Sequence, residues 1–190
     1  FIQRNRYVWW RVMRDYFQSI ALELFKHIQK DEFLIINFDA EESNFVRLNK
    51  AKIRQPGNVK QISMSLSLSN RDKKNLKSYV RLNGSFDRDL ATLIKTLNYL
   101  RRELPDLPKD PYLLFSKSVQ STEITDEKKY INDQENLDYI LTNISGLDLV
   151  GIYSSGYIYT GLANSLGQFN WHSDYSFSFD YSIYNENNNA

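Results

Sequence analysis

The last third of the chain contains a run of residues whose alternation strongly restricts how it can fold. From Tyr175 to Ile183, aromatic or aliphatic residues alternate strictly with small polar ones. Successive residues of a β-strand point to opposite faces of a sheet, so this run predicts a strand with one aromatic face and one polar face. A second strand is predicted over Leu149–Tyr159, and the segment GLANSLG between the two predicts a turn. We expect the aromatic face to be core, packed against the helices predicted over residues 1–30 and Leu90–Leu104.

The remaining elements follow from hydrophobic periodicity. Apolar residues at steps of three and four predict long helices over residues 1–30 and 86–104 and a shorter one from Asp133. Short apolar or alternating runs predict four more strands, with a polar turn over residues 39–44, a second turn at Gln55-Pro56-Gly57 and irregular structure over residues 112–131. These strands are Phe33–Phe38, Phe45–Ile53, Val59–Ser69 and Leu76–Leu82. The order predicts an α+β fold, a mostly antiparallel curved sheet of about six strands with two long helices and one shorter helix packed on it.

Composition excludes several kinds of site within this chain. The 190 residues include no cysteine and only two histidines, His27 and His172, so disulfides, thiolate metal sites and His-rich metal centres are ruled out. The net charge of +1 gives no bulk attraction to nucleic acid, and no apolar run approaches the ~20 residues needed to cross a bilayer. We therefore expect a cytoplasmic protein with neither nucleic acid nor a membrane as partner.

Individual chemical motifs are weak. The acids Asp39, Glu41 and Glu42 lie in a predicted loop, where solvated charge is a better interpretation than general acid–base catalysis. His172 has Ser173 and Asp174 beside it, but neighbours in sequence do not converge as a catalytic triad must.

The first dozen residues combine arginines with two tryptophans. Such a helix could contact a membrane surface or RNA, although the simpler interpretation is a helix extension, or upstream sequence before a true start at Met13. No recognised nucleic-acid-binding pattern accompanies these residues.

Three stretches, taken in order, resemble a known family. The first runs from Phe38 to Arg47 and continues with Asn49, Ile53, Arg54 and Gln55; the second is the SMSLSL strand. The third is Gly161–Gly167, followed by Trp171, His172 and the SFSF strand. Together they resemble the TldD/PmbA family of predicted zinc metallopeptidases, once called modulators of DNA gyrase, and in particular a bacterial TldD-related branch. The resemblance covers roughly residues 30–184.

The resemblance implies a domain that is not catalytic alone. Family members regarded as active in proteolysis hold zinc with an HExxxH helix and a further ligand downstream of this domain, and no such motif exists here. It implies no cofactor in this chain, with zinc expected only if a C-terminal domain follows. It also implies a homodimer, or a heterodimer with a family paralogue, that encloses a peptide substrate. The alternative is a TldE-like partner subunit, a peptide- or protein-binding module without its own zinc site.

The resemblance also suggests boundaries and a site. We expect an N-terminal helix over residues 1–29, the family's α/β domain over residues 30–184, and a polar tail or linker over residues 185–190. Because the chain lacks an initial Met, we expect it to be an excerpt or a processed product. Asn164, Ser165 and Gly167 are interpreted either as a structural hairpin turn or as a peptide-binding turn beside an exposed strand edge.

Overall fold

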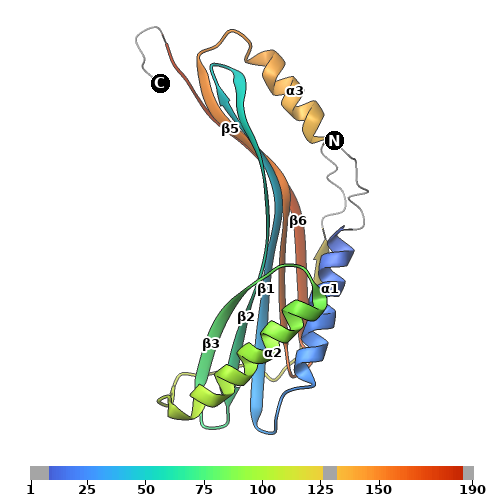
Figure 1. The fold of residues 1–190 in the computed structure, drawn as a ribbon, viewed down its shortest axis with the longest axis vertical. Coiled ribbons are helices and arrows are strands. Elements are labelled where there is room, and N and C mark those ends of the chain that lie inside the picture. Colours follow the sequence, from blue (N-terminus) through green and yellow to red (C-terminus); the bar gives the residue numbers. More distant parts are fainter. Residues whose placement is uncertain (1–8, 126–131, 186–190) are drawn as a thin grey trace. The chain divides into compact units, whose positions relative to one another are not determined.

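A computed structural model describes residues 9–125 and 132–185. It contains a six-stranded sheet of order β3-β2-β1-β5-β6-β4 and three α-helices (Figure 1). The helices are α1 (Trp9–Phe25), α2 (Phe86–Glu103) and α3 (Asp133–Asn143); the strands are β1 (Glu32–Asn49), β2 (Lys52–Asn70), β3 (Asn75–Leu82), β4 (Thr122–Thr125), β5 (Leu149–Asn164) and β6 (Phe169–Ile183). The sheet is mostly antiparallel, with β4 pairing parallel to β6. The predicted α+β class, six strands, two long helices and one shorter helix are confirmed.

The chain divides into two compact units. Unit 1 comprises Phe1–Ala40, Gln61–Thr125 and Tyr159–Ser173, and unit 2 comprises Glu41–Lys60, Asp126–Ile158 and Asp174–Ala190. Four strands, β1, β2, β5 and β6, each contribute one part to each unit. The domain boundaries expected from the sequence remain predictions.

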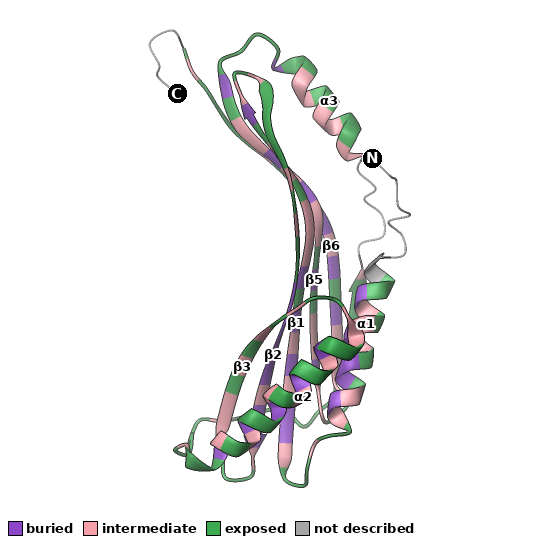
Figure 2. Ribbon diagram, in the orientation of Figure 1, coloured by how far each residue is buried: buried purple, intermediate pink, exposed green. Residues whose placement is uncertain are grey.

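Unit 1 has an apolar core between helices α1 and α2 and one face of its strands. The apolar stripe of α1 brings Phe17, Ile20 and Leu24 inward, all fully buried. The stripe of α2 adds Leu93, Leu97 and Leu100, and alternate residues of β1 and β2 complete the core, where buried residues meet (Figure 2). In β2 these inward residues are Ile62, Met64, Leu66 and Leu68, as their alternation with serines predicts. Burial of these stripes is the main source of helix stability here.

An aromatic cluster joins α1 to three strands. The Phe17 ring stacks on Phe38 of β1 at 5.1 Å and on Phe169 of β6 at 5.4 Å between centroids, with Trp171 6.3 Å away. Gly161 of β5 lies beneath this ring, because a Cβ at that position would stand 2.4 Å from Phe17 Cε1. The glycine therefore makes room for the close approach of α1 to the sheet.

Unit 2 has a smaller core in which helix α3 packs on strands. Leu48 of β1, Leu149 of β5 and Ile144, which follows α3, are buried together, and Ile140, Leu141 and Phe179 pack against them. The helix begins with Asn132 as its N-cap, whose side chain accepts hydrogen bonds from the backbone N–H groups of Gln134 and Glu135.

Two predicted turns were wrong, because β1 and β2 are each continuous. The polar segment 39–44 lies within β1, where Glu42 is 4.0 Å from Lys60 of β2. Pro56 lies within β2, outside the stretch Ile62–Ser69 that pairs with β3. Proline lacks a backbone N–H donor, and it is tolerated in this part of β2, where β3 no longer pairs with the strand. The actual turn is at Lys50 and Ala51, both with positive φ (49° and 54°), the pattern of a tight hairpin.

Three further expectations differ from the structure. The predicted helix over residues 1–30 ends at Phe25, and residues 1–8 lie outside the described part of the chain. The segment predicted to be irregular contains β4, which the sequence did not reveal. The aromatic face of β6 is only partly core: Tyr175 is 4% exposed, but Phe177 and Tyr181 are 52% and 53% exposed.

Candidate functional site

The ANSLG segment forms the hairpin turn between β5 and β6. Its backbone closes through Asn164 N–H donating to Gln168 O (3.0 Å) and Gly167 N–H donating to Asn164 O (3.1 Å). The Asn164 side chain accepts from the N–H groups of Leu166 (2.9 Å) and Gln168 (3.1 Å). Gly167 has φ +98°, a conformation that favours glycine. Asn164 and Gly167 thus each satisfy a specific geometric requirement of the turn.

Ser165 connects this turn to strand β1. Its N–H donates to Leu34 O (3.0 Å), and its Oγ accepts from Leu34 N–H (3.1 Å). The hydroxyl takes the place of a backbone carbonyl, so the pairing of β1 with the hairpin extends into the turn. These bonds give Ser165 a structural role, whether or not it also contacts a peptide.

The other side of the same hairpin is occupied by the segment that leads into β4. Gln168 exchanges two hydrogen bonds with the Gln120 backbone (2.7 and 2.6 Å), and Phe169 N–H donates to Ser121 Oγ (3.0 Å). Strand β4 then pairs with Asn170–Ser173 of β6. An extended peptide would have to displace one of these neighbours to pair beside the turn. Peptide binding by Asn164, Ser165 and Gly167 stays a prediction.

The other sequence candidates do not converge. Trp171 and Ser173 are buried at 1% and 2% exposure, whereas His172 between them is exposed, as alternation along β6 requires. Among residues 9–125 and 132–185, no group of three or more His, Asp or Glu side chains is placed to hold a metal ion. In the same ranges no helix is long and apolar enough to cross a membrane.

One buried and one partly buried carboxylate anchor helices, and the sequence did not single them out. Asp89 of α2 is 3% exposed and accepts from the Tyr16 hydroxyl (2.6 Å) and from the N–H groups of Asn83 (3.1 Å) and Gly84 (2.8 Å). Burial, followed by the hydrogen bond to Asp89, raises the pKa of Tyr16 above its ordinary value. This carboxylate ties α1, α2 and the end of β3 together within unit 1.

Asp133 plays the matching part in unit 2. It lies at the start of α3 and accepts from the hydroxyls of Tyr175 and Tyr153, the latter at 3.5 Å. Burial raises the pKa of both tyrosines, and for Tyr175 the hydrogen bond to Asp133 raises it further. Both hydroxyls therefore stay protonated donors, which suits an anchor for α3 better than a catalytic acid.

Unit 2 contains a shallow depression of about 610 Å³ near the β1–β2 turn. Its lining includes Arg47, Arg54, Val150, Ile152, Asp180 and Ser182. The absence of any acidic residue from Asn44 to Lys60, a stretch with five basic residues, could have indicated this surface from the sequence. The depression itself could not be predicted, since it depends on how four strands lie next to one another.

Comparison with known proteins places the fold. No family model matches the chain, and no curated protein matches it either. Solved structures do match: a protein described as a modulator of DNA gyrase from Bacteroides thetaiotaomicron (TM-score 0.56, 18% identity, 91% of this chain and 40% of that one) and another from Thermotoga maritima (0.54, 11%, 88% and 43%). TldE from Thermococcus kodakarensis matches with TM-score 0.50 and 10% identity over 89% of this chain and 43% of its own.

The chain thus spans about two fifths of the length of the structures it matches. At these identities the likeness concerns the fold. The chain has the fold of the TldD/PmbA proteins, the family that its sequence resembles.

Proposed function

We propose that this chain is the non-catalytic N-terminal domain of a cytoplasmic TldD/PmbA-type protein related to zinc metallopeptidases. In this role it helps to form a dimer and to enclose a channel that accepts peptides. One observation carries the proposal: three solved structures of modulator-of-gyrase or TldE type match 88–91% of this chain, while the chain spans only 40–43% of each.

A second candidate is a partner subunit that binds peptides or proteins without a zinc site of its own. The likeness to TldE from Thermococcus kodakarensis favours this alternative. An HExxxH helix encoded after Ala190 would support the first candidate, and a continuation of the gene without that motif would support the second.

The proposal is tested on the purified 190-residue chain. Unstructured peptides are incubated with the chain with and without zinc, and cleavage is followed by mass spectrometry. We expect no cleavage under either condition, peptide binding by fluorescence anisotropy, and a dimeric mass by light scattering. Zinc-dependent turnover that disappears with a chelator would contradict the assignment of a non-catalytic domain.

A further inference from the structure

The β1–β2 hairpin of unit 2 carries a cluster of basic residues near its turn. Arg47, Lys50, Lys52 and Arg54 occur within eight positions around its turn. Farther from the turn, Glu42 of β1 and Lys60 of β2 form an ion pair at 4.0 Å. Within the described ranges, none of the four basic residues at the turn forms a salt bridge. Their charge is therefore available to an anionic ligand.

Two of these residues share one depression. Arg47 and Arg54 line it together with Asp180, the one acidic residue in its lining, and neither arginine forms an ion pair with that aspartate among the described contacts. Two like charges on neighbouring strands repel one another. An anion bound between them would relieve this repulsion.

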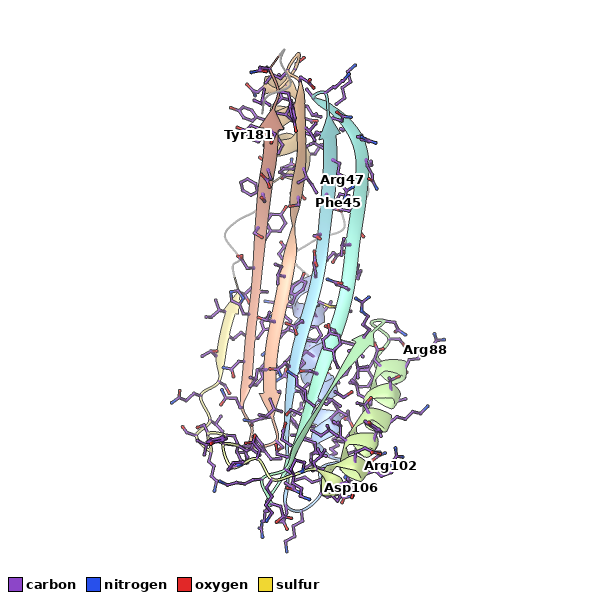
Figure 3. All side chains as sticks on the ribbon, turned by 90° about the vertical axis from the view of Figure 1, so that its left-hand side faces the viewer. Phe45, Arg47, Arg88, Arg102, Asp106 and Tyr181 are labelled. Atoms are coloured by element: carbon purple, nitrogen blue, oxygen red, sulfur yellow. The ribbon has the colours of Figure 1, made fainter. Side chains whose placement is uncertain are left out.

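A column of contacts restrains the exposed side chain of Arg47. Its guanidinium lies over the Phe45 ring, 5.8 Å from the centroid, and both residues belong to β1 (Figure 3). The Phe45 ring in turn lies against Gly57 of β2, where a Cβ would stand 2.3 Å from Phe45 Cζ. Gly57 leaves room for the ring beside β2, and the ring faces the guanidinium in a cation–π contact. A pre-positioned arginine loses less entropy on binding than a freely moving one.

We propose that this depression binds an acidic peptide segment, with an Asp or Glu side chain between Arg47 and Arg54. The planar guanidinium matches a carboxylate through two parallel hydrogen bonds. Val150, which is 44% exposed, and Ile152 provide an apolar floor for a neighbouring side chain of the peptide. Asp180 and Ser182 on the opposite wall disfavour the continuous phosphate backbone of a nucleic acid, which needs basic residues along its whole path.

This inference rests on the proposed peptide-handling function and names its substrate class. It is tested by fluorescence anisotropy on the 190-residue chain with three labelled peptides of equal length. One contains Glu-Leu pairs separated by serine and glycine, and in the others glutamine or lysine replaces glutamate. We expect the acidic peptide to bind at least tenfold more tightly than the neutral one, and this preference to shrink as the NaCl concentration rises.

Substitutions locate the effect. Arg47→Gln with Arg54→Gln removes two charges and should abolish the preference. Arg88→Gln with Arg102→Gln, on α2 of unit 1, removes the same charge elsewhere and should leave the preference unchanged. Phe45→Leu keeps both charges but removes the cation–π platform, and it should weaken acidic-peptide binding several-fold. Thermal unfolding establishes that each variant is folded.

The alternative outcomes are distinct. Equal affinity for the three peptides would overturn the inference while leaving the peptide-handling function intact. Failure of every peptide to bind would overturn that function as well. Tighter binding of a single-stranded DNA oligonucleotide than of the acidic peptide, lost in the Arg47→Gln, Arg54→Gln variant, would assign the surface to nucleic acid and refute the proposal.

Discussion

The buried Asp89 carboxylate allows a quantitative test of what holds unit 1 together. Tyr16→Phe removes the 2.6 Å hydrogen bond from α1 but leaves the two backbone donors of Asn83 and Gly84 in place. A hydrogen bond to a charged group contributes about 1.5–3 kcal/mol, so we expect a loss of about 2 kcal/mol in the free energy of unfolding. For a chain of this length the corresponding fall in Tm is about 4–8 °C.

Asp89→Asn probes the same network from the other side. In the wild type, Oδ2 accepts from both Tyr16 and Gly84, and Oδ1 accepts from Asn83. If the amide oxygen introduced by Asp89→Asn takes the place of Oδ2, the NH2 group takes the place of Oδ1 and faces the Asn83 N–H. Two donors then face each other, and a buried donor is left unsatisfied at a cost of about 1–3 kcal/mol. Because both substitutions weaken one shared bond, the double variant should be less destabilised than the sum of the two.

The assay is urea unfolding followed by circular dichroism and tryptophan fluorescence, with Tyr79→Phe as control, since Tyr79 is 64% exposed. The free energy of unfolding is also measured as a function of pH. The raised pKa of folded Tyr16 means that its contribution is fully present below pH 10.0, the ordinary value, and is lost as the pH rises further. Tyr16→Phe should remove this part of the alkaline destabilisation. A Tyr16→Phe variant within about 0.5 kcal/mol of the wild type would refute the reasoning, because it would match an ordinary surface change.

Three further predictions concern the core, an ion pair and the turn. Gly161→Ala should destabilise the protein by about 1–3 kcal/mol, because its Cβ would stand 2.4 Å from a fully buried Phe17 ring, and adding Phe17→Leu should restore part of the loss in urea unfolding. The pKa of Glu32 is lowered, because hydrogen bonds from Arg101 and Gln29 outweigh the opposing effect of burial, so its contribution is present above pH 4.5 and lost as the pH falls; Glu32→Gln should flatten the acid limb of a stability–pH curve, and an unchanged limb would contradict this. Asn164→Ala should cost about 1–2 kcal/mol by removing the acceptor of two backbone N–H groups, whereas Asn164→Asp, which keeps that acceptor, should stay near wild-type Tm.

Periodicity predicted the elements well where burial decides structure. The Ser/apolar alternation of Ile62–Ser69 and the leucine stripe of α2 both predicted the inward face correctly. Turn-forming residues were less reliable indicators of where a strand ends. Gln55-Pro56-Gly57 lies inside β2, where β3 no longer pairs with the strand and a proline is therefore tolerated. The real turn, at Lys50 and Ala51, has neither Gly nor Asn at its two central positions to indicate it.

Sequence patterns could not predict which side chains far apart along the chain contact each other. Asp89 and Tyr16 are 73 positions apart, and nothing local indicates that they meet. The aromatic face of β6 illustrates the opposite error: its strict alternation predicted a strand correctly, but alternation does not state how much of a strand is covered. Tyr175 is buried beside Asp133, whereas Tyr181 is half exposed.

The bond between Leu34 and Ser165 has a consequence for synthesis of the chain. These partners are separated by 131 positions, so β5 is synthesised long after β1, β2 and β3. Until then the central strand β1 has β2 on one side but no β5 on the other. At about 5–20 residues per second, the ribosome needs on the order of 10 s to supply that partner. During this interval one hydrogen-bonding edge of β1, a strand that contains Phe33, Leu34, Ile35 and Ile36, is open to other chains. The yield of folded protein should therefore depend on chaperones that shield this edge while translation continues.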